Sequence, residues 1–96
     1  MIARLWRGAA GDDAAAAAYL RHVERNVVPQ LAAIAGYRDV KVLRREREFV
    51  VITFWESMDA VRRFAGDDPE RAVVEPEARA VLAEFDDFVR HYEVAL

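Results

Sequence analysis

The sequence predicts one α+β domain whose strands and helices follow each other in the order βαββαβ. A long segment with helical periodicity follows a short apolar first strand. Two adjacent segments rich in β-branched and aromatic residues come next. A second helical region and an alternating final segment complete the order. The length of 96 residues is that of one domain, so residues 1–96 are expected to fold as a unit.

Residues 2–7 are the first expected strand, and residues 8–11, which begin and end with glycine, are the turn after it. Asp12 or Asp13 can cap the following helix, because a carboxylate accepts hydrogen bonds from the free N–H groups of the first turn. Apolar residues then recur at steps of three and four, which marks one buried helical face. This set is Leu20, Val23, Val27, Leu31 and Ile34.

Pro29 falls inside this periodic segment. Proline lacks the backbone N–H and disfavours α geometry at the preceding residue, Val28. We therefore expect a kink or a break there, and we expect Gly36 to close the helical region.

Residues 37–45 and 48–55 are two expected strands joined by a tight polar turn. The second strand is apolar on both faces, so both faces need a cover. Helices can cover one of them. The other would expose an apolar set, which is unusual for a monomer: Leu5, Val50, Ile52 and Phe54. Pairing two sheets face to face removes that exposure, so we predict a homodimer through this face.

Ser57 is the expected cap of a helix that ends at Gly66. Asp68-Pro69-Glu70 and Glu75-Pro76-Glu77 each combine a cap, a proline suited to the first helical position and an acid. The second of them leads into a short helix that continues to Ala83, and residues 85–94 are the last expected strand. The whole order is the ferredoxin-like arrangement, with helices on one face of a four-stranded antiparallel sheet.

Composition excludes several functions. The net charge is −3 with acids and bases interspersed, which gives no footprint for nucleic acid. The apolar stretches are too short for a membrane span. There is no cysteine, which excludes thiolate catalysis and thiolate metal sites. The N-terminus is too short and too charged for a signal peptide, and we expect a cytoplasmic protein.

The segment Phe54-Trp55-Glu56-Ser57, followed by Ala60 and Phe64, resembles the strand-to-helix signature of antibiotic-biosynthesis monooxygenase-like domains. Residues 2–7, 35–37 and 89–94 are also similar to this family. The resemblance implies a dimeric α+β barrel with a ligand pocket between sheet and helices in each subunit. It implies cofactor-independent oxygenation of a small aromatic or polyketide-type molecule, which is our leading hypothesis. The alternative is a non-catalytic ligand-binding or stress-response dimer of the same fold.

The resemblance also implies that Trp55 lines the pocket. Thr53 shares its face, because side chains alternate along a strand. This chain departs from the family at two positions. Haem-degrading relatives carry an asparagine where this chain has Arg4, and an iron-ligating histidine near Val74. We therefore disfavour haem degradation. Some cofactor-free oxygenases use an asparagine near the tryptophan, whereas the only asparagine here is Asn26.

Arg4 and Trp6 share one face of the first strand and could reach the pocket. Arg4 can hold a substrate carboxylate or phenolate, or pair internally with an acid such as Glu93. We prefer the internal pair, because buried cations are usually paired within the protein. His91, in the last strand, is the best candidate general base, since its pKa lies near neutrality. The alternative is a strand histidine bonded to a neighbour.

Two interpretations fit each remaining candidate. Trp55 is either a pocket wall or a core residue. Tyr19, His22 and Asn26 form a polar stripe on the first helix, and they either line the pocket entrance or mark the edge of the buried face, which we prefer. His22 and His91 do not make a metal site without a third ligand, so we expect no metal and no cofactor. Helix capping accounts for the acids between residues 67 and 77.

Overall fold

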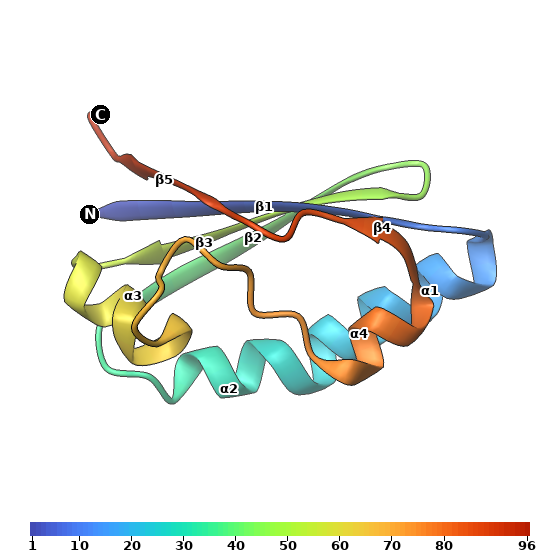
Figure 1. The fold of residues 1–96 in the computed structure, drawn as a ribbon, viewed down its shortest axis with the longest axis horizontal. Helices are drawn as coiled ribbons and strands as arrows, with labels where there is room; N and C mark the ends of the chain where they lie inside the picture. Colours follow the sequence, from blue (N-terminus) through green and yellow to red (C-terminus); the bar gives the residue numbers. More distant parts are fainter.

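A computed structural model describes all residues, 1–96. One antiparallel sheet lies over a layer of helices (Figure 1). The elements, in chain order, are β1 (Ile2–Ala10), α1 (Asp13–His22), the π-helical turn η1 (Val23–Val27), α2 (Val28–Ala32), β2 (Tyr37–Arg45), β3 (Glu48–Trp55), α3 (Met58–Ala65), α4 (Pro76–Val81), β4 (Leu82–Phe85) and β5 (Arg90–Glu93).

The sheet confirms the predicted fold class, with one change at its edge. Its order is β2-β3-β1, and both β4 and β5 pair with the free side of β1. The last strand, expected over residues 85–94, is therefore two short strands in one position. β4 pairs with the end of β1, from Gly8 to Ala10, and β5 pairs with its beginning, from Ile2 to Leu5. The sheet has five strands but keeps the ferredoxin-like order.

β1 is longer than the expected residues 2–7, because Gly8 continues the strand instead of opening a turn. A Cβ on residue 8 would lie only 2.5 Å from the Trp6 ring, which is too close for any side chain. Gly8 thus makes room for the indole. The chain turns only at Gly11.

The long helical region does not break at Pro29, contrary to our expectation. Val28 has helical angles, with φ −58° and ψ −47°. The turn before it is wider than an α-helical turn, and the Val28 N–H donates to the Val23 carbonyl, five residues back. A proline ring in a helix clashes with the carbonyl four residues before it. A π-turn is one of the ways in which a helix relieves such a clash and continues.

Local caps form largely as predicted. Asp12, not Asp13, caps α1, and its Oδ1 accepts the Ala15 N–H at 2.7 Å. Ser57 caps α3 by accepting the Ala60 N–H at 3.2 Å. α4 begins at Pro76 as expected and ends at Val81, because the chain then extends into β4.

The Asp68-Pro69-Glu70 segment forms a turn and starts no helix. Two of its carbonyls are used by distant parts of the chain. The Pro69 carbonyl accepts from the Arg4 side chain, and the Glu70 carbonyl accepts the Val89 N–H at 2.7 Å. These tertiary bonds hold the backbone in a shape that a helix would not allow.

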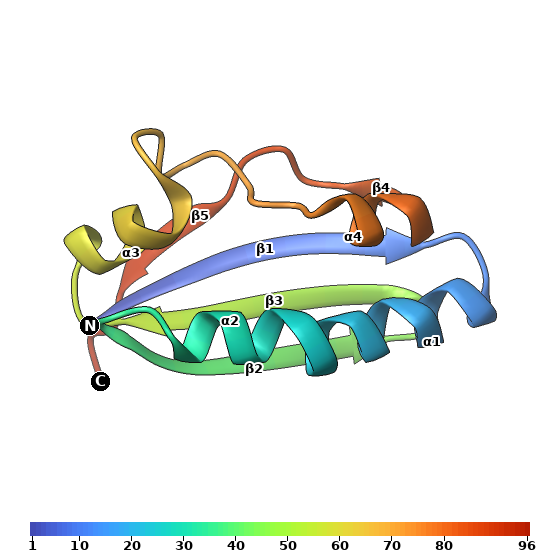
Figure 2. The ribbon, with the colours of Figure 1, turned by 90° about the horizontal axis from the view of Figure 1, so that it is seen from below.

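Helices cover only one face of the sheet (Figures 1 and 2). Phe49, Thr53 and Trp55 of β3 are buried against them, and Val51 shares their face. Val50, Ile52 and Phe54 point to the open face, as the alternation predicts. Two buried clusters form the core. One surrounds Phe49 and Tyr19, and the other surrounds Trp55 and Leu31.

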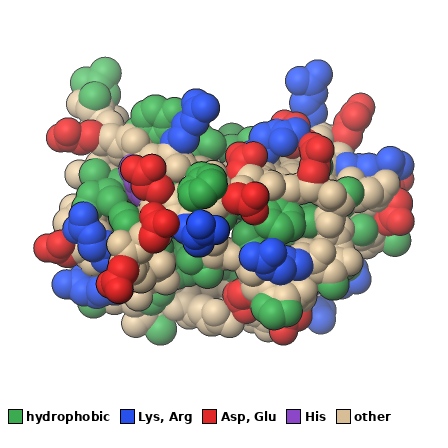
Figure 3. All heavy atoms as spheres, viewed as in Figure 1, with side chains coloured by type: hydrophobic (Ala, Val, Ile, Leu, Met, Phe, Trp, Pro, Cys, Tyr) green, Lys and Arg blue, Asp and Glu red, His purple; other side chains and the backbone are tan.

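No helix is long and apolar enough to cross a membrane. Acidic and basic side chains are interspersed on the face shown in Figure 3, without a large area of one sign. This distribution agrees with the charge pattern of the sequence.

Candidate functional site

One transverse row of residues crosses the sheet beneath the helices. Backbone pairing places Val40 of β2 opposite Thr53 of β3, Thr53 opposite Arg4 of β1, and Arg4 opposite His91 of β5. Residues directly opposite in antiparallel strands bring their side chains together on the same face. Three residues selected from the sequence are therefore neighbours: Arg4, Thr53 and His91.

A cavity of about 80 Å³ lies between this row and the helices. Its walls are mostly apolar. The long helical region contributes Tyr19, Val23, Val27 and Leu31, and the sheet contributes Arg4, Trp6, Val40, Val51 and Thr53. The rest of the wall is Phe64 of α3, Val73 and Val74 of the segment before α4, and Val89 just before β5. A small set of polar groups in an apolar cavity is the usual composition of a ligand site.

Arg4 is the only charged residue of the cavity lining, and 4% of it is exposed. Its Nη1 donates to the Pro69 carbonyl, and its Nη2 donates to the Arg71 carbonyl at 2.9 Å. Nη1 also lies 3.1 Å from His91 Nε2. Burial lowers the pKa of Arg4 to about 10, so the guanidinium is still a cation at neutral pH.

No carboxylate pairs with Arg4, so the internal ion pair that we preferred, with Glu93 or another acid, does not form. The charge is stabilised by two carbonyl dipoles, an imidazole nitrogen and the Phe64 ring, whose centroid is 5.6 Å from the guanidinium carbon. A guanidinium has five N–H donors. Three are used, which leaves Nε–H and one Nη2–H for a ligand.

His91 touches Arg4 and does not line the cavity. Its pKa is lowered, first by desolvation and then by the Arg4 charge, and Glu70 opposes this shift. The imidazole is therefore neutral at neutral pH. Because the guanidinium can only donate, His91 Nε2 must be the acceptor of their hydrogen bond.

Trp55 is fully buried and packs in the core cluster around Leu31, so it is not part of the cavity wall. Its Nε1 donates to Thr53 Oγ1 at 2.9 Å. This bond occupies a lone pair of the Thr53 hydroxyl and leaves its hydrogen free to point elsewhere. Trp55 thus supports the cavity through Thr53. Trp6 does line the cavity, but its Nε1 donates to the Asp86 carbonyl at 2.9 Å.

Of the three residues in the expected polar stripe, Tyr19, His22 and Asn26, only Tyr19 reaches the cavity. Tyr19 lines the cavity, and its hydroxyl makes no hydrogen bond to the protein. Burial raises the pKa of Tyr19, so the hydroxyl stays a neutral donor. His22 is buried outside the cavity lining, and its Nδ1 lies 3.1 Å from the Nδ2 of Asn26, which is exposed.

Sequence reasoning missed the wall made by Phe64, Val73 and Val74, and the carbonyls of Pro69 and Arg71. From the sequence, Val74 was considered only because it stands near the position where haem-degrading relatives carry an iron-ligating histidine. Any residue has a carbonyl, so no residue type in the sequence could have indicated these acceptors for Arg4. The complete site presents donors from Arg4, Thr53 and Tyr19 and no carboxylate, and it suits an apolar ligand with an anionic or electron-rich oxygen.

Comparisons with known proteins identify the family and the fold. Residues 10–76 match the family described as antibiotic biosynthesis monooxygenase. No curated protein matches the chain. SnoaB, a cofactor-independent oxygenase from Streptomyces nogalater, is similar with a TM-score of 0.74 and 16% identity, over 99% of this chain and 93% of its own.

Two further solved structures carry ligands. A mutant of MhuD with two manganese protoporphyrin IX molecules bound per active site has a TM-score of 0.67 and 21% identity, over 100% of this chain and 96% of its own. The ActVA-Orf6 monooxygenase of Streptomyces coelicolor, in complex with nanaomycin D, has a TM-score of 0.58 and 17% identity, over 71% of this chain and 62% of its own. These likenesses show a shared fold.

Proposed function

The chain belongs to the antibiotic biosynthesis monooxygenase family, and from this premise we propose that it is a cofactor-independent monooxygenase acting on a small aromatic or polyketide-type molecule. The observation that carries the proposal is Arg4. A buried cation with no acidic partner and two spare N–H donors stands at an otherwise apolar cavity. A planar apolar molecule with a phenolate or enolate oxygen complements it in shape and charge.

Arg4 has a chemical task beyond holding the substrate. A cation beside a phenol or enol favours the ionised form and lowers the substrate pKa. The resulting anion is electron-rich and can react directly with oxygen. Without a cofactor the substrate must supply all the electrons. Oxidation of a ring CH₂ to C=O by one O₂ gives four electrons, places one oxygen atom in the carbonyl and releases the other as water.

In this proposal His91 positions Arg4. This role replaces that of general base, for which His91 was the best candidate in the sequence. Its neutral Nε2 accepts from Arg4 Nη1 and is not directed at the cavity. Accepting this bond leaves the Nε edge of the guanidinium for the substrate. Thr53 and Tyr19 supply further donors to substrate oxygens, and Trp6 supplies an apolar wall.

The cavity must widen to admit such a substrate. Its volume of about 80 Å³ is far below the roughly 300–1,000 Å³ that drug-sized ligands occupy. The wall that can give way is the segment between α3 and α4, which carries Val73 and Val74 and has no helix or strand of its own. Substrate binding is expected to displace this segment.

The test is oxygen uptake with a panel of hydroxylated quinol-like and anthrone-like compounds in metal-free buffer. We expect one O₂ consumed for each carbonyl formed. Arg4→Met removes the cation at similar length and should lower kcat/KM by about 30-fold to several thousandfold, since loss of one partner of a buried charged hydrogen bond costs about 2–5 kcal/mol. Arg25→Met removes an exposed arginine and is the matched control. Absence of turnover across the panel would contradict the enzymatic proposal.

The same spare donors support a second candidate, a non-catalytic ligand-binding dimer. It predicts that the same compounds raise the unfolding temperature in an Arg4-dependent way and yield no product. Haem degradation has less support, because no imidazole lines the cavity and Val74 stands near the position of the family's iron ligand. A haem titration that gave a histidine-ligated spectrum would reverse that judgement.

We further propose that the protein works as a homodimer through the open face of the sheet. This face carries Leu5, Val50, Ile52 and Phe54, with Leu43 and Tyr92 about half exposed at 53% and 51%. Arg7, Lys41 and Arg90 stand opposite Val50, Ile52 and Leu5 and share this face, so its apolar residues are mixed with charged ones. Apolar residues gathered on one sheet face support a protein–protein contact.

A further inference from the structure

One buried polar atom, His22 Nε2, lies outside the site described above and has no hydrogen-bond partner. His22 Nε2 is the only fully buried side-chain nitrogen or oxygen without a hydrogen-bond partner. The residue is 8% exposed. Leaving a buried polar atom unsatisfied costs about 1–3 kcal/mol, so such an atom calls for an explanation.

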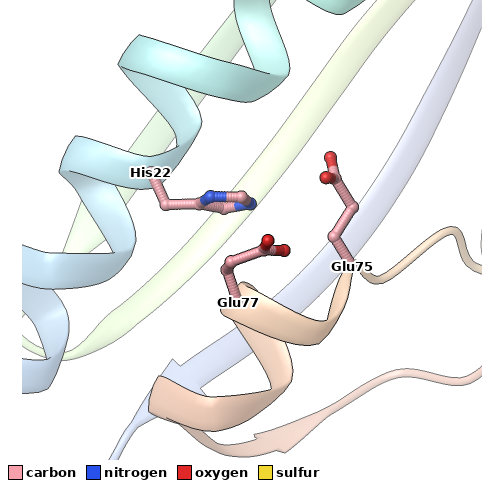
Figure 4. A group of neighbouring side chains, drawn as sticks. All are labelled: His22, Glu75 and Glu77. Atoms are coloured by element: carbon pink, nitrogen blue, oxygen red, sulfur yellow. The ribbon is translucent and has the colours of Figure 1, made fainter.

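Two carboxylates lie near the His22 ring. Glu75 and Glu77, at the beginning of α4, point toward the His22 ring on α1 (Figure 4). One nitrogen of His22 and one oxygen of each glutamate all lie within 4.8 Å of one another.

Neither glutamate is occupied elsewhere. No ion pair of the structure involves Glu75 or Glu77. Glu75 stands at the cap position of α4 but makes no capping hydrogen bond. Helix capping, which the sequence suggested as the role of these acids, therefore does not account for the Glu75 side chain.

We propose that His22, Glu75 and Glu77 bind a first-row transition-metal dication, with Zn²⁺ as the best fit. An imidazole nitrogen with two carboxylates is a common zinc ligand set, and water can complete the tetrahedron. The two carboxylate charges balance the charge of the ion. Zinc–ligand bonds of about 2.0–2.2 Å place ligand atoms about 3.3 Å apart, so the glutamates must close in by rotation of their side chains. Glu75 is half-buried and Glu77 is exposed, which leaves room for that rotation.

Asn26 supplies the outer support that metal-bound histidines generally need. Its side-chain amide lies 3.1 Å from His22 Nδ1. A half-turn of the amide presents its oxygen to Nδ1–H, which leaves the Nε2 lone pair free for the metal.

The site would join two elements that form opposite walls of the cavity. His22 precedes Val23 and Glu75 follows Val74, and both valines line the cavity. A bound ion would fix the beginning of α4 to the end of α1. Its role is structural, and it does not depend on the reaction proposed above.

The test is calorimetric titration of tag-free, metal-stripped protein with Zn²⁺. We expect one saturable ion per chain. The chain has only two histidines, which gives a matched pair of variants. His22→Gln should abolish binding and His91→Gln should retain it. Asn26→Ala should weaken binding about 10- to 100-fold. Mg²⁺ and Ca²⁺ should not compete, because both prefer all-oxygen ligands.

A second pair of variants covers the case in which His22→Gln fails to fold. Glu75→Gln/Glu77→Gln changes side chains at the surface and should abolish binding without lowering the unfolding temperature of the metal-free protein. Asp86→Asn/Asp87→Asn removes the same charge from exposed positions and should bind as the wild type does. Zn²⁺ should raise the unfolding temperature of the wild type and of this control, and it should not raise that of the glutamine pair.

Cobalt gives an independent signature. Co²⁺ bound by nitrogen and oxygen ligands should produce a visible absorption that Zn²⁺ displaces and that the glutamine pair lacks. The proposal is overturned if the wild type shows no saturable 1:1 binding, or if either the His22 variant or the glutamine pair binds as tightly as the wild type.

Discussion

Arg4 shows how a charge can be buried without an ion pair. Moving a guanidinium from water into an apolar site is costly unless its donors are satisfied. Here carbonyls and a neutral imidazole satisfy three of them and cancel none of the charge. A carboxylate partner would have stabilised Arg4 and neutralised the cavity. The arrangement keeps a full positive charge available to a ligand.

Thr53 links the core tryptophan to the cavity, which gives the first prediction. Thr53→Val keeps the shape of the side chain but leaves the buried Trp55 N–H without an acceptor. The free energy of unfolding should fall by about 1–3 kcal/mol, the usual cost of a buried unsatisfied donor. Urea unfolding measures it. Thr53→Ser keeps the hydroxyl and should recover most of the hydrogen-bond contribution.

His91 gives a prediction on pH. Its pKa in the folded protein lies below its ordinary value of 6.5, because burial and Arg4 disfavour the imidazolium more than Glu70 favours it. Between the two pKa values the unfolded chain binds more protons than the folded protein, so stability rises with pH through this window. The contribution is complete above pH 6.5 and is lost on acidification.

The measurement is urea unfolding of the wild type and of His91→Gln at a series of pH values from neutral to mildly acidic. Glutamine can still accept from Arg4 and does not titrate, so the variant should lose less stability as the pH falls below 6.5. Equal slopes for the two proteins would contradict the assignment.

At the scale of elements, the turn after α2 depends on Gly36. Its φ is +90°, and a Cβ there would lie 2.5 Å from the Ala60 Cβ on α3. Gly66, after α3, also has a positive φ of +84° but has open space around it. Gly66→Ala should cost about 1–3 kcal/mol through backbone strain alone.

Gly36→Ala should cost more than Gly66→Ala, because it adds a steric clash to the strain and moves α3 relative to the sheet. Chemical denaturation of both variants gives the comparison. A smaller loss for Gly36→Ala would show that α3 can shift without cost.

The elements also show which parts of the fold can be predicted from local sequence. The caps at Asp12 and Ser57 were predicted because a cap involves only the next three residues. The Asp68-Pro69-Glu70 cap was wrong because its carbonyls bond to β1 and to Val89, both distant in sequence. Local signals identify an element reliably where no distant partner competes for its backbone.

At the scale of the molecule, strand alternation predicted that Thr53 shares the face of Trp55 and that Arg4 shares the face of Trp6. The row of Arg4, Thr53 and His91 follows from the register between strands, which alternation within one strand does not determine. Alternation also could not tell a cavity wall from the core, and Trp55 belongs to the core. Whether Trp55 touches the cavity depends on where α3 packs, and that position follows from contacts far apart in the chain.

The open sheet face carries the prediction for the assembly. Ile52→Asp places a charge at the centre of the proposed dimer contact and should yield monomers, because burying an unpaired carboxylate is strongly unfavourable. Light scattering coupled to size exclusion measures the mass. Asp59→Ala, on the exposed side of α3, should leave the wild-type mass unchanged. A wild type with the mass of one chain at micromolar concentration would contradict the dimer.

The π-turn η1 has a consequence for the shape of the cavity. Tyr19, Val23, Val27 and Leu31 all line it, at steps of four residues. Each such step in an α-helix overshoots a full turn by about 40°, and three steps would carry the last side chain about 120° round the axis. The wider turn offsets part of this drift and keeps the halves of the helix in phase. Deleting one residue within η1 would leave Tyr19 and Val27 seven residues apart, which in a regular α-helix is about 20° short of two full turns. The deletion should therefore replace the wide turn by an ordinary one and keep both side chains on the cavity face.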